Sequence, residues 1–262
     1  MKKSIFVCLL ILTATLFTLP VFAQNIKDGL IAYWSFDGDA KDGSGNANNG
    51  TITGGPTFVT GKFGKAISFG ASGDSVAVKA NEPLKLKGGA FSVSAYIKPA
   101  STDHGDILYH GLGCSTWASW FLGMQGAEPD AALVANNIVF GVRTSNGSGY
   151  TAVSTDASSF VGNWVHVAVT HDGSNLTLYI DGKQKKQTVT KDIPYDSQEN
   201  LYMGGDVGCG GRSWFKNSSL DEVRLYSRAL TDKEVAILTS GGLAVVSSSS
   251  KLAITWGEAK EK

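Results

Sequence analysis

The chain has 262 residues, of which 18% are charged, and its 23 Lys and Arg balance 23 Asp and Glu. Glycine makes up 32 of 262 residues, about 12% against a usual level of about 7%, which indicates many turns and excludes a disordered chain or a coiled coil. Because the net charge is zero and lysines cluster only over residues 183–186, no basic field exists to attract a phosphate backbone. The composition therefore argues against a nucleic acid partner.

Residues 1–23 have the features of a cleavable signal peptide. A basic start, Met1-Lys2-Lys3, precedes an uncharged apolar run over residues 5–19, and a small residue, Ala23, precedes the expected cleavage site. The apolar run is shorter than the roughly 20 residues needed to span a bilayer, and no later segment approaches that length. We therefore expect a chain that is secreted to the periplasm or the cell exterior, with no membrane span after cleavage.

Short runs in which apolar residues alternate or cluster follow the signal peptide, a pattern typical of strands. The expected strands are residues 30–36, 65–69, 75–78, 91–97, 107–110, 117–124, 137–143, 164–170, 176–180, 201–203 and 220–226. Asp172-Gly173 and Asp181-Gly182 punctuate residues 163–187. Because Asx-Gly supplies the positive φ values of tight turns, these pairs predict two consecutive hairpins.

One short helix is expected after the last strand. Thr231 can accept hydrogen bonds from first-turn amides while Glu234 reaches back, a capping box ahead of an apolar run. Many short strands with glycine-rich turns predict an all-β fold, a two-sheet antiparallel β-sandwich with one short C-terminal helix. We assign this domain to residues 24–242 and a Ser-rich linker with a short tail to residues 243–262.

Two cysteines, Cys114 and Cys209, remain after removal of the signal peptide. In an oxidising compartment they are expected to form a disulfide bond. Closing a loop of about 95 residues would contribute about 4 to 5 kcal/mol in the chain-entropy model. The alternative is a pair of buried thiols.

Several separated blocks of the sequence point to a family. Residues 29–37 (GLIAYWSFD), 61–69 (GKFGKAISF), 163–182 and 220–230 (LDEVRLYSRAL) occur in an order that resembles the laminin G-like domains of the concanavalin A-like lectin and glucanase superfamily. The resemblance covers about residues 28–240 and implies a two-sheet jelly roll. Because this superfamily includes lectins, adhesion modules and glycoside hydrolases, function has to be argued from the site.

A structural calcium site is expected near the N-terminal loop. Ca²⁺ takes about six to eight oxygen ligands, and the pattern Asp42-x-Ser44-x-Asn46-x-Asn48 offers side-chain oxygens at alternate positions, with Asp37 just upstream. The resemblance implies Asp221 as a further ligand, since it matches an acidic position on the closing strand that helps to hold an ion in relatives. The alternative is an Asx-rich turn without metal.

A sugar-binding platform is expected near the cysteines. If Cys114 and Cys209 are bonded, their loops bring together two indoles and two charged side chains: Trp117, Trp214, Asp206 and Arg212. Aromatic rings can stack on sugar rings while charged groups bind the hydroxyls. Tyr109 and Tyr202, on neighbouring predicted strands, are further candidates. The alternative is that the tryptophans are ordinary core residues.

Catalysis is not expected, because a retaining glycosidase needs two carboxylates. The hydrolase branch of the superfamily carries Glu-x-Asp followed by a second Glu, whereas here Glu128-Pro129-Asp130 is followed by Ala131, Ala132 and Leu133. The sequence therefore predicts a non-catalytic module that binds a polysaccharide or a glycosylated extracellular partner. A glycoside hydrolase or polysaccharide lyase, and an adhesion domain that binds protein, are the alternatives.

Overall fold

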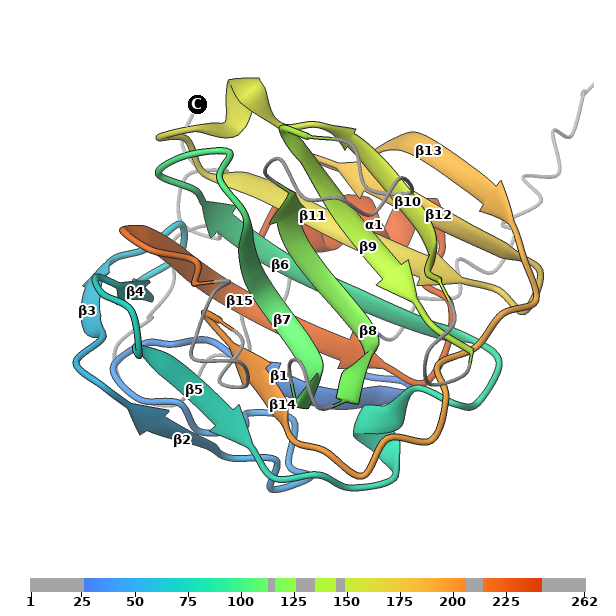
Figure 1. Ribbon diagram of the computed structural model, residues 1–262, viewed down its shortest axis with the longest axis horizontal. Helices are drawn as coiled ribbons and strands as arrows, with labels where there is room; N and C mark the ends of the chain where they lie inside the picture. Colours follow the sequence, from blue (N-terminus) through green and yellow to red (C-terminus); the bar gives the residue numbers. More distant parts are fainter. Residues whose placement is uncertain (1–25, 113–115, 126–134, 145–148, 206–213, 242–262) are drawn as a thin grey trace, which may run out of the picture.

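The computed structural model describes residues 26–112, 116–125, 135–144, 149–205 and 214–241, without the side chains of residues 112, 116 and 117. These residues form two antiparallel β-sheets that lie face to face, with one α-helix outside them (Figure 1). The expected antiparallel β-sandwich with a short C-terminal helix is confirmed. In Figure 1 the seven-stranded sheet, called sheet B below, lies in front of the eight-stranded sheet, called sheet A.

Sheet A contains the closing strand and both predicted hairpins. In spatial order its strands are β13 (Lys183–Val189), β12 (Asn175–Ile180), β11 (Val165–His171), β6 (Phe91–Lys98), β15 (Ser218–Tyr226), β4 (Lys65–Phe69) and β3 (Thr57–Thr60), with β1 (Leu30–Trp34) also paired to β15. Asp181 and Gly182 have φ values of 48° and 76° between β12 and β13. These are the left-handed conformations that a two-residue hairpin turn requires.

Sheet B is the second layer of the sandwich. In spatial order its strands are β10 (Thr151–Asp156), β9 (Asn137–Val142), β8 (Thr116–Gln125), β7 (Gly105–Leu112), β14 (Leu201–Met203), β5 (Ser75–Val78) and β2 (Gly50–Thr53). Two short 3₁₀ turns, η1 (Pro83–Lys85) and η3 (Ser158–Phe160), lie in the loops that connect the sheets.

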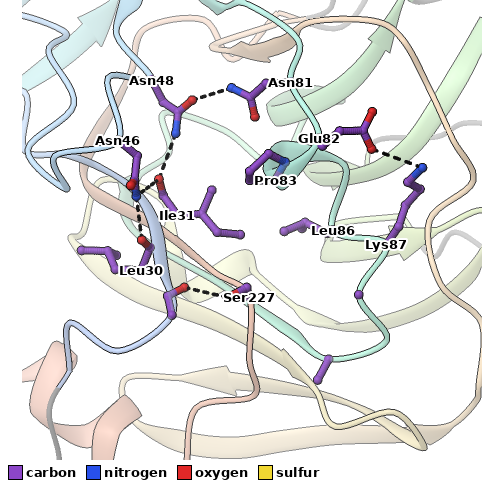
Figure 2. Close-up of a pocket in the computed structure, with 13 residues that line it drawn as sticks. Leu30, Ile31, Asn46, Asn48, Asn81, Glu82, Pro83, Leu86, Lys87 and Ser227 are labelled. Carbon is purple, nitrogen blue, oxygen red and sulfur yellow. Dashed lines mark hydrogen bonds and ion pairs between the residues drawn. The ribbon is translucent and has the colours of Figure 1, made fainter.

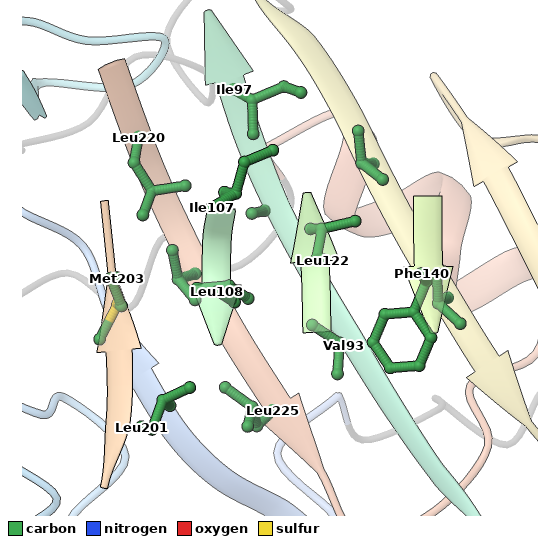
Figure 3. Close-up of a cluster of buried hydrophobic side chains, with 14 of the residues drawn as sticks. Val93, Ile97, Ile107, Leu108, Leu122, Phe140, Leu201, Met203, Leu220 and Leu225 are labelled. Carbon is green, nitrogen blue, oxygen red and sulfur yellow. The ribbon is translucent and has the colours of Figure 1, made fainter. Parts of the chain in front are cut away.

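The core fills the space between the sheets (Figure 3). Sheet A contributes residues such as Val93, Ile97 and Leu225, which pack against Leu122 and Phe140 of sheet B. Each fully buried side chain of this size contributes about 1.5 to 3 kcal/mol relative to exposure.

The indole N–H groups of two core tryptophans donate hydrogen bonds to backbone carbonyls. Trp34 Nε1 donates to the carbonyl of Asn48 at 2.9 Å, and Trp120 Nε1 donates to that of Leu84 at 3.0 Å. Buried tryptophans are stable in a core when the indole N–H finds such a partner.

The helix α1 (Asp232–Thr239) begins with the predicted capping box. Glu234 N donates to Thr231 Oγ1 at 3.3 Å, and Thr231 N donates to Glu234 Oε2 at 2.8 Å. Val235 and Leu238 pack on the outer face of sheet A against Tyr179 and other residues, so the helix covers part of that face. Within the described residues, no helix is both long and apolar enough to cross a membrane.

Three strands were not foreseen: β2, β3 and β10. Their sequences, GTIT, TFVT and TAVSTD, are rich in threonine, and each lies at the edge of its sheet. An edge strand is partly solvated, so its sequence lacks the apolar run that marks a buried strand.

Candidate functional site

The outer face of sheet B carries a row of aromatic side chains. Tyr202 of β14 lies opposite Tyr109 of β7, Tyr109 lies opposite Phe121 of β8, and Phe121 lies opposite Gly141 of β9. Directly opposed residues of neighbouring strands point to the same face. Because the adjacent residues Leu108, Trp120 and Met203 lie in the core, this row lies on the outer face of sheet B. Sheet B is the layer in front in Figure 1.

A glycine makes room for the row. A Cβ on Gly141 would lie 2.3 Å from Phe121 Cε1, so the ring covers bare backbone at this position. Phe121 contacts Tyr150 edge to face with ring centroids 4.8 Å apart, and the guanidinium of Arg143 lies 4.1 Å above the Tyr150 ring. Phe121 and Tyr109 are 3% and 8% exposed, whereas Tyr150 and Tyr202 are half-buried. The accessible aromatic surface therefore lies toward the two ends of the row.

Trp214 lies beside the β14 end of this row. Its backbone bridges to Asp106 and to Gly205, which follows β14 by two residues. A Cβ on Gly205 would lie 2.2 Å from Trp214 Cε3, so the indole packs on the glycine backbone. Phe215 lies in the core, and Trp214, its neighbour in an extended segment, points to the other side. The indole is half-buried.

Three of the predicted sugar-binding residues therefore gather on one face: Tyr109, Tyr202 and Trp214. The backbone of Trp117 lies in β8, and its side chain lies outside the described residues, as do Asp206, Arg212, Cys114 and Cys209. Phe121, Tyr150 and Arg143 were missed. The parity of β8 could have revealed Phe121, because a buried Trp120 places its neighbour on the opposite face.

Hydrogen bonds occupy the carboxylate of Asp42, one of the predicted calcium ligands. Oδ1 accepts from Tyr33 N at 3.0 Å and Ser44 N at 2.8 Å. Oδ2 accepts from Ser44 Oγ and from Asn48 N, both at 2.8 Å. Four donors use the approximately four lone-pair sites of a carboxylate. Asp42 therefore orders its own loop.

The remaining side chains of this loop cover the edge of β1. Asn46 Nδ2 donates to the carbonyls of Leu30 and Ile31 at 2.9 Å each, and Asn48 Nδ2 donates to that of Ile31 at 2.9 Å. Ser44 Oγ, which donates its proton to Asp42, also lies 3.2 Å from the Ile31 carbonyl oxygen. An exposed strand edge offers unpaired backbone groups to other chains. The alternating polar residues satisfy these groups within the molecule.

Asp221 and Asp37, the other two predicted calcium ligands, both bind the turn between β3 and β4. Asp221 Oδ2 accepts from Lys62 N at 2.9 Å and Phe63 N at 3.0 Å, and Asp37 Oδ1 accepts from Lys65 N at 2.8 Å. Asp221 is 0% exposed, and its Oδ1 has no hydrogen-bond partner within the described residues. Burial raises the pKa of Asp221 to about 7, with the carboxylates of Glu222 and Asp37 adding to the effect.

No group of three or more His, Cys, Asp or Glu side chains in the described part of the chain is placed to hold a metal ion. Any metal at Asp221 would therefore draw further ligands from backbone carbonyls or water, which Ca²⁺ accepts readily.

Glu222 follows in a β-bulge with a left-handed φ of 54°. Its Oε2 accepts from Arg224 Nη2 at 2.5 Å, and both its carboxylate oxygens accept from the Tyr33 hydroxyl at 3.0 Å. Burial raises the pKa of Tyr33. With Glu222 only 2% exposed, this carboxylate stabilises the bulge and is closed to a substrate. Glu128 and Asp130, considered above for hydrolysis, lie outside the described residues.

A family model described as the concanavalin A-like lectin/glucanases superfamily, of the laminin G type, matches residues 70–236. Pappalysin-1 of Mus musculus is 25% identical over 125 residues, which are 46% of this chain and 8% of that protein. The chain therefore spans only a small part of this relative.

Solved structures of binding domains share the fold. The binding domain of Paraclostridial Mosquitocidal Protein 1 aligns with a TM-score of 0.66 and 20% identity, over 83% of this chain and 53% of that one. The binding domain of Botulinum Neurotoxin DC aligns at 17% identity in complex with SialylT (TM-score 0.60) and with rat synaptotagmin II (TM-score 0.59), in each case over 84% of this chain and 53% of that one. The chain thus spans about half of each domain, and at these identities the likeness shows the fold alone.

Proposed function

Since the chain belongs to the concanavalin A-like lectin/glucanase superfamily, we propose that it is a non-catalytic binding module that recognises a glycan through the outer face of sheet B. The observation that carries this proposal is the register of Tyr202, Tyr109 and Phe121 across three strands, with Trp214 beside them. The solved neighbours with the same fold are binding domains, which supports a binding module as the general class.

Tyr202 and Trp214, the half-buried rings at the β14 end of this face, are the ones that contact the ligand. An aromatic face stacks on the apolar side of a sugar ring, and a few polar groups orient the hydroxyls. The Tyr202 hydroxyl accepts from Asn200 Nδ2 at 3.4 Å and keeps its proton to donate. Tyr109 and Phe121 lie in the same row but are almost fully buried, so they offer little surface to a ligand.

The test is binding of residues 24–262 to an array of glycans and polysaccharides. Wild type is compared with Trp214→Ala and Tyr202→Ala, and Tyr202→Phe is the control because it keeps the ring. Loss of binding in both alanine variants, with retention in Tyr202→Phe and unchanged melting temperatures, supports the proposal. If the wild-type protein binds no glycan on the array, the proposal is overturned and a protein ligand is favoured. Release of reducing ends that Glu128→Ala abolishes would instead establish a hydrolase.

A structural calcium ion bound by Asp221 and Asp37 is a second proposal. It is supported by the unpartnered Asp221 Oδ1, an oxygen without solvent contact in a carboxylate that Asp37 and Glu222 repel. Hard oxygen donors suit Ca²⁺, and a bound ion would neutralise this charge. Asp42 and Asn46 are left out of this ligand set because their hydrogen bonds hold the β1 edge. Calorimetric titration of the EDTA-treated protein with CaCl₂ measures the binding.

Export and the disulfide bond are also proposals. The support for export is the signal-like composition of residues 1–23. Mass spectrometry of the protein recovered outside the cytoplasm should give a chain that begins at Gln24. A chain that retains its first residues would contradict cleavage.

A further inference from the structure

A pocket lies where β1 begins, and none of the described residues that line it is aromatic. It has a volume of about 870 Å³, opens to solvent, and is lined by the start of β1, the loop that contains Asn46 and Asn48, and the segment 81–90 around η1 (Figure 2). This volume falls within the range of about 300 to 1,000 Å³ that is typical of small-molecule sites. The pocket is therefore large enough for a ligand of several rings.

One wall is built from three side-chain amides. Asn48 Oδ1 accepts from Asn81 Nδ2 at 2.5 Å, which joins the loop over β1 to the segment before η1. Asn81 Oδ1 accepts from Leu84 N at 3.2 Å, so the amide is held from both sides. Asn46 Oδ1 accepts no hydrogen bond from the described residues, and one N–H of Asn81 is likewise unused there. An acceptor and a donor on the same wall suit a hydroxyl group, which both donates and accepts.

The other wall carries Glu82 and Lys87, which belong to an ion network without net charge. Lys85 Nζ lies 2.7 Å from Glu82 and 2.6 Å from Asp196, and Lys87 Nζ lies 2.8 Å from Asp196 and 3.5 Å from Glu82. Two ammonium groups thus neutralise two carboxylates. A phosphate, a sulfate or an ammonium ligand would have to displace an existing partner here, so the wall favours a neutral ligand with many hydroxyls.

The space between the walls is aliphatic. Ile31, Pro83 and Leu86 line it, and Figure 2 shows these side chains between the amides and the Glu82–Lys87 ion pair. Aliphatic carbons pack against the C–H groups of a sugar ring, and the hydroxyls at its rim then meet the polar walls.

An extended peptide is a poorer fit than a sugar. Strand addition requires free backbone groups at a sheet edge. The carbonyls of Leu30 and Ile31 already accept from Asn46 and Asn48, and Tyr33 N and O are bonded to Asp42 and Gly43. These backbone groups at the edge of β1 are therefore not free to pair with a partner strand.

We propose that this pocket is a saccharide site that takes a neutral oligosaccharide or the uncharged end of a glycan, with Asn46 and Asn81 binding the hydroxyls. The site is separate from the aromatic face of sheet B and does not depend on the function proposed for that face.

The test uses NMR titration of the full mature chain with uncharged trisaccharides: cellotriose, maltotriose, xylotriose, mannotriose and triacetylchitotriose. Gly88 lines the pocket, and a Cβ there has no neighbour within 4 Å, so Gly88→Leu is the variant chosen to obstruct the space. Gly55→Leu is the matched control, because its Cβ is equally free and it lies outside the pocket. Asn46→Ala removes the free acceptor from an exposed position.

At least one trisaccharide should shift the side-chain amide signals of Asn46 and Asn81. Affinity should fall about tenfold or more in Gly88→Leu and Asn46→Ala, and it should persist in Gly55→Leu and in Tyr202→Ala. The proposal is overturned if no trisaccharide shifts these signals, if Gly88→Leu binds as wild type does, or if Tyr202→Ala alone abolishes binding. It is also overturned if a sulfated trisaccharide shifts the same amides more strongly than every neutral one.

Discussion

Replacement of Asp221 by asparagine tests both the electrostatics of the closing strand and the calcium proposal. Burial raises the pKa of this carboxyl from its ordinary value of 3.8 to about 7. The folded state therefore holds a proton that the unfolded state releases, so the contribution of Asp221 to stability is fully present below about pH 4 and is lost as the pH rises through about 7. At 1.36 kcal/mol per pKa unit, the loss is about 4 kcal/mol.

Asparagine resembles the protonated acid. Its carbonyl oxygen can accept from Lys62 N and Phe63 N, as Asp221 Oδ2 does, and it carries no charge. In EDTA at about pH 8, Asp221→Asn should be more stable than wild type by up to about 4 kcal/mol, and the difference should vanish below about pH 4. Urea denaturation across this pH range measures both values.

Calcium should reduce this difference. If the ion binds Asp221, free calcium at about 100 times its dissociation constant stabilises wild type by about 2.7 kcal/mol and leaves the variant unchanged. Equal stabilisation of both proteins would place the ion elsewhere. A variant that is less stable than wild type in EDTA at about pH 8 would refute the electrostatic argument itself.

Asp74 supplies the matched control. It is also buried, but despite that burial the N–H groups of Gly55, Ala71 and Gly70 hold the pKa of its carboxyl below the ordinary value. The ionised form is the one stabilised, so the contribution of Asp74 is present above its unfolded pKa and is lost as the pH falls. Asp74→Asn should therefore destabilise the protein at neutral pH, by about 1 to 3 kcal/mol.

Three further predictions follow from packing, a buried ion pair and the cysteines. Gly141→Ala should destabilise by about 1 to 3 kcal/mol in urea denaturation, because its Cβ would lie 2.3 Å from Phe121; Gly149→Ala, whose Cβ meets nothing within 4 Å, should be neutral. Arg224→Met should cost about 3 to 5 kcal/mol, since it leaves the buried Glu222 carboxylate without its cation, and a loss below about 1 kcal/mol would contradict that role. Reduction should add two hydrogens to the mass of the mature chain, whereas two thiols that alkylate before reduction would exclude the bridge between its two cysteines.

Much of the secondary structure could be predicted because its signals are local. The Asp-Gly pair at residues 181–182 requires only the φ values of its own residues, and the capping box of α1 joins residues three apart. Strands in the middle of a sheet, such as β11, are buried along their whole length and rich in apolar residues. The edge strand β10 has half-buried, threonine-rich sequence, and no local signal separates such a segment from a loop.

The candidate site residues depended on the sequence in different ways. Tyr109 and Tyr202 could be chosen as aromatic residues on neighbouring strands, but the role of Asp42 and Asn46 depended on what lay opposite them. Their spacing is equally compatible with an ion and with a strand edge, and the structure places the backbone of β1 there.

The sequence by itself determined the alternation that folds this chain into two sheets, together with its turns and its helix cap, because those features depend on neighbours along the chain. Only the tertiary structure decided that Tyr202 lies opposite Tyr109, that Asn81 meets Asn48, and that Asp221 is buried beside Asp37. These contacts join distant segments, and a strand that slipped by one residue would turn each side chain to the opposite face. Register and burial are properties of the packed sandwich, in which every strand constrains the position of the next.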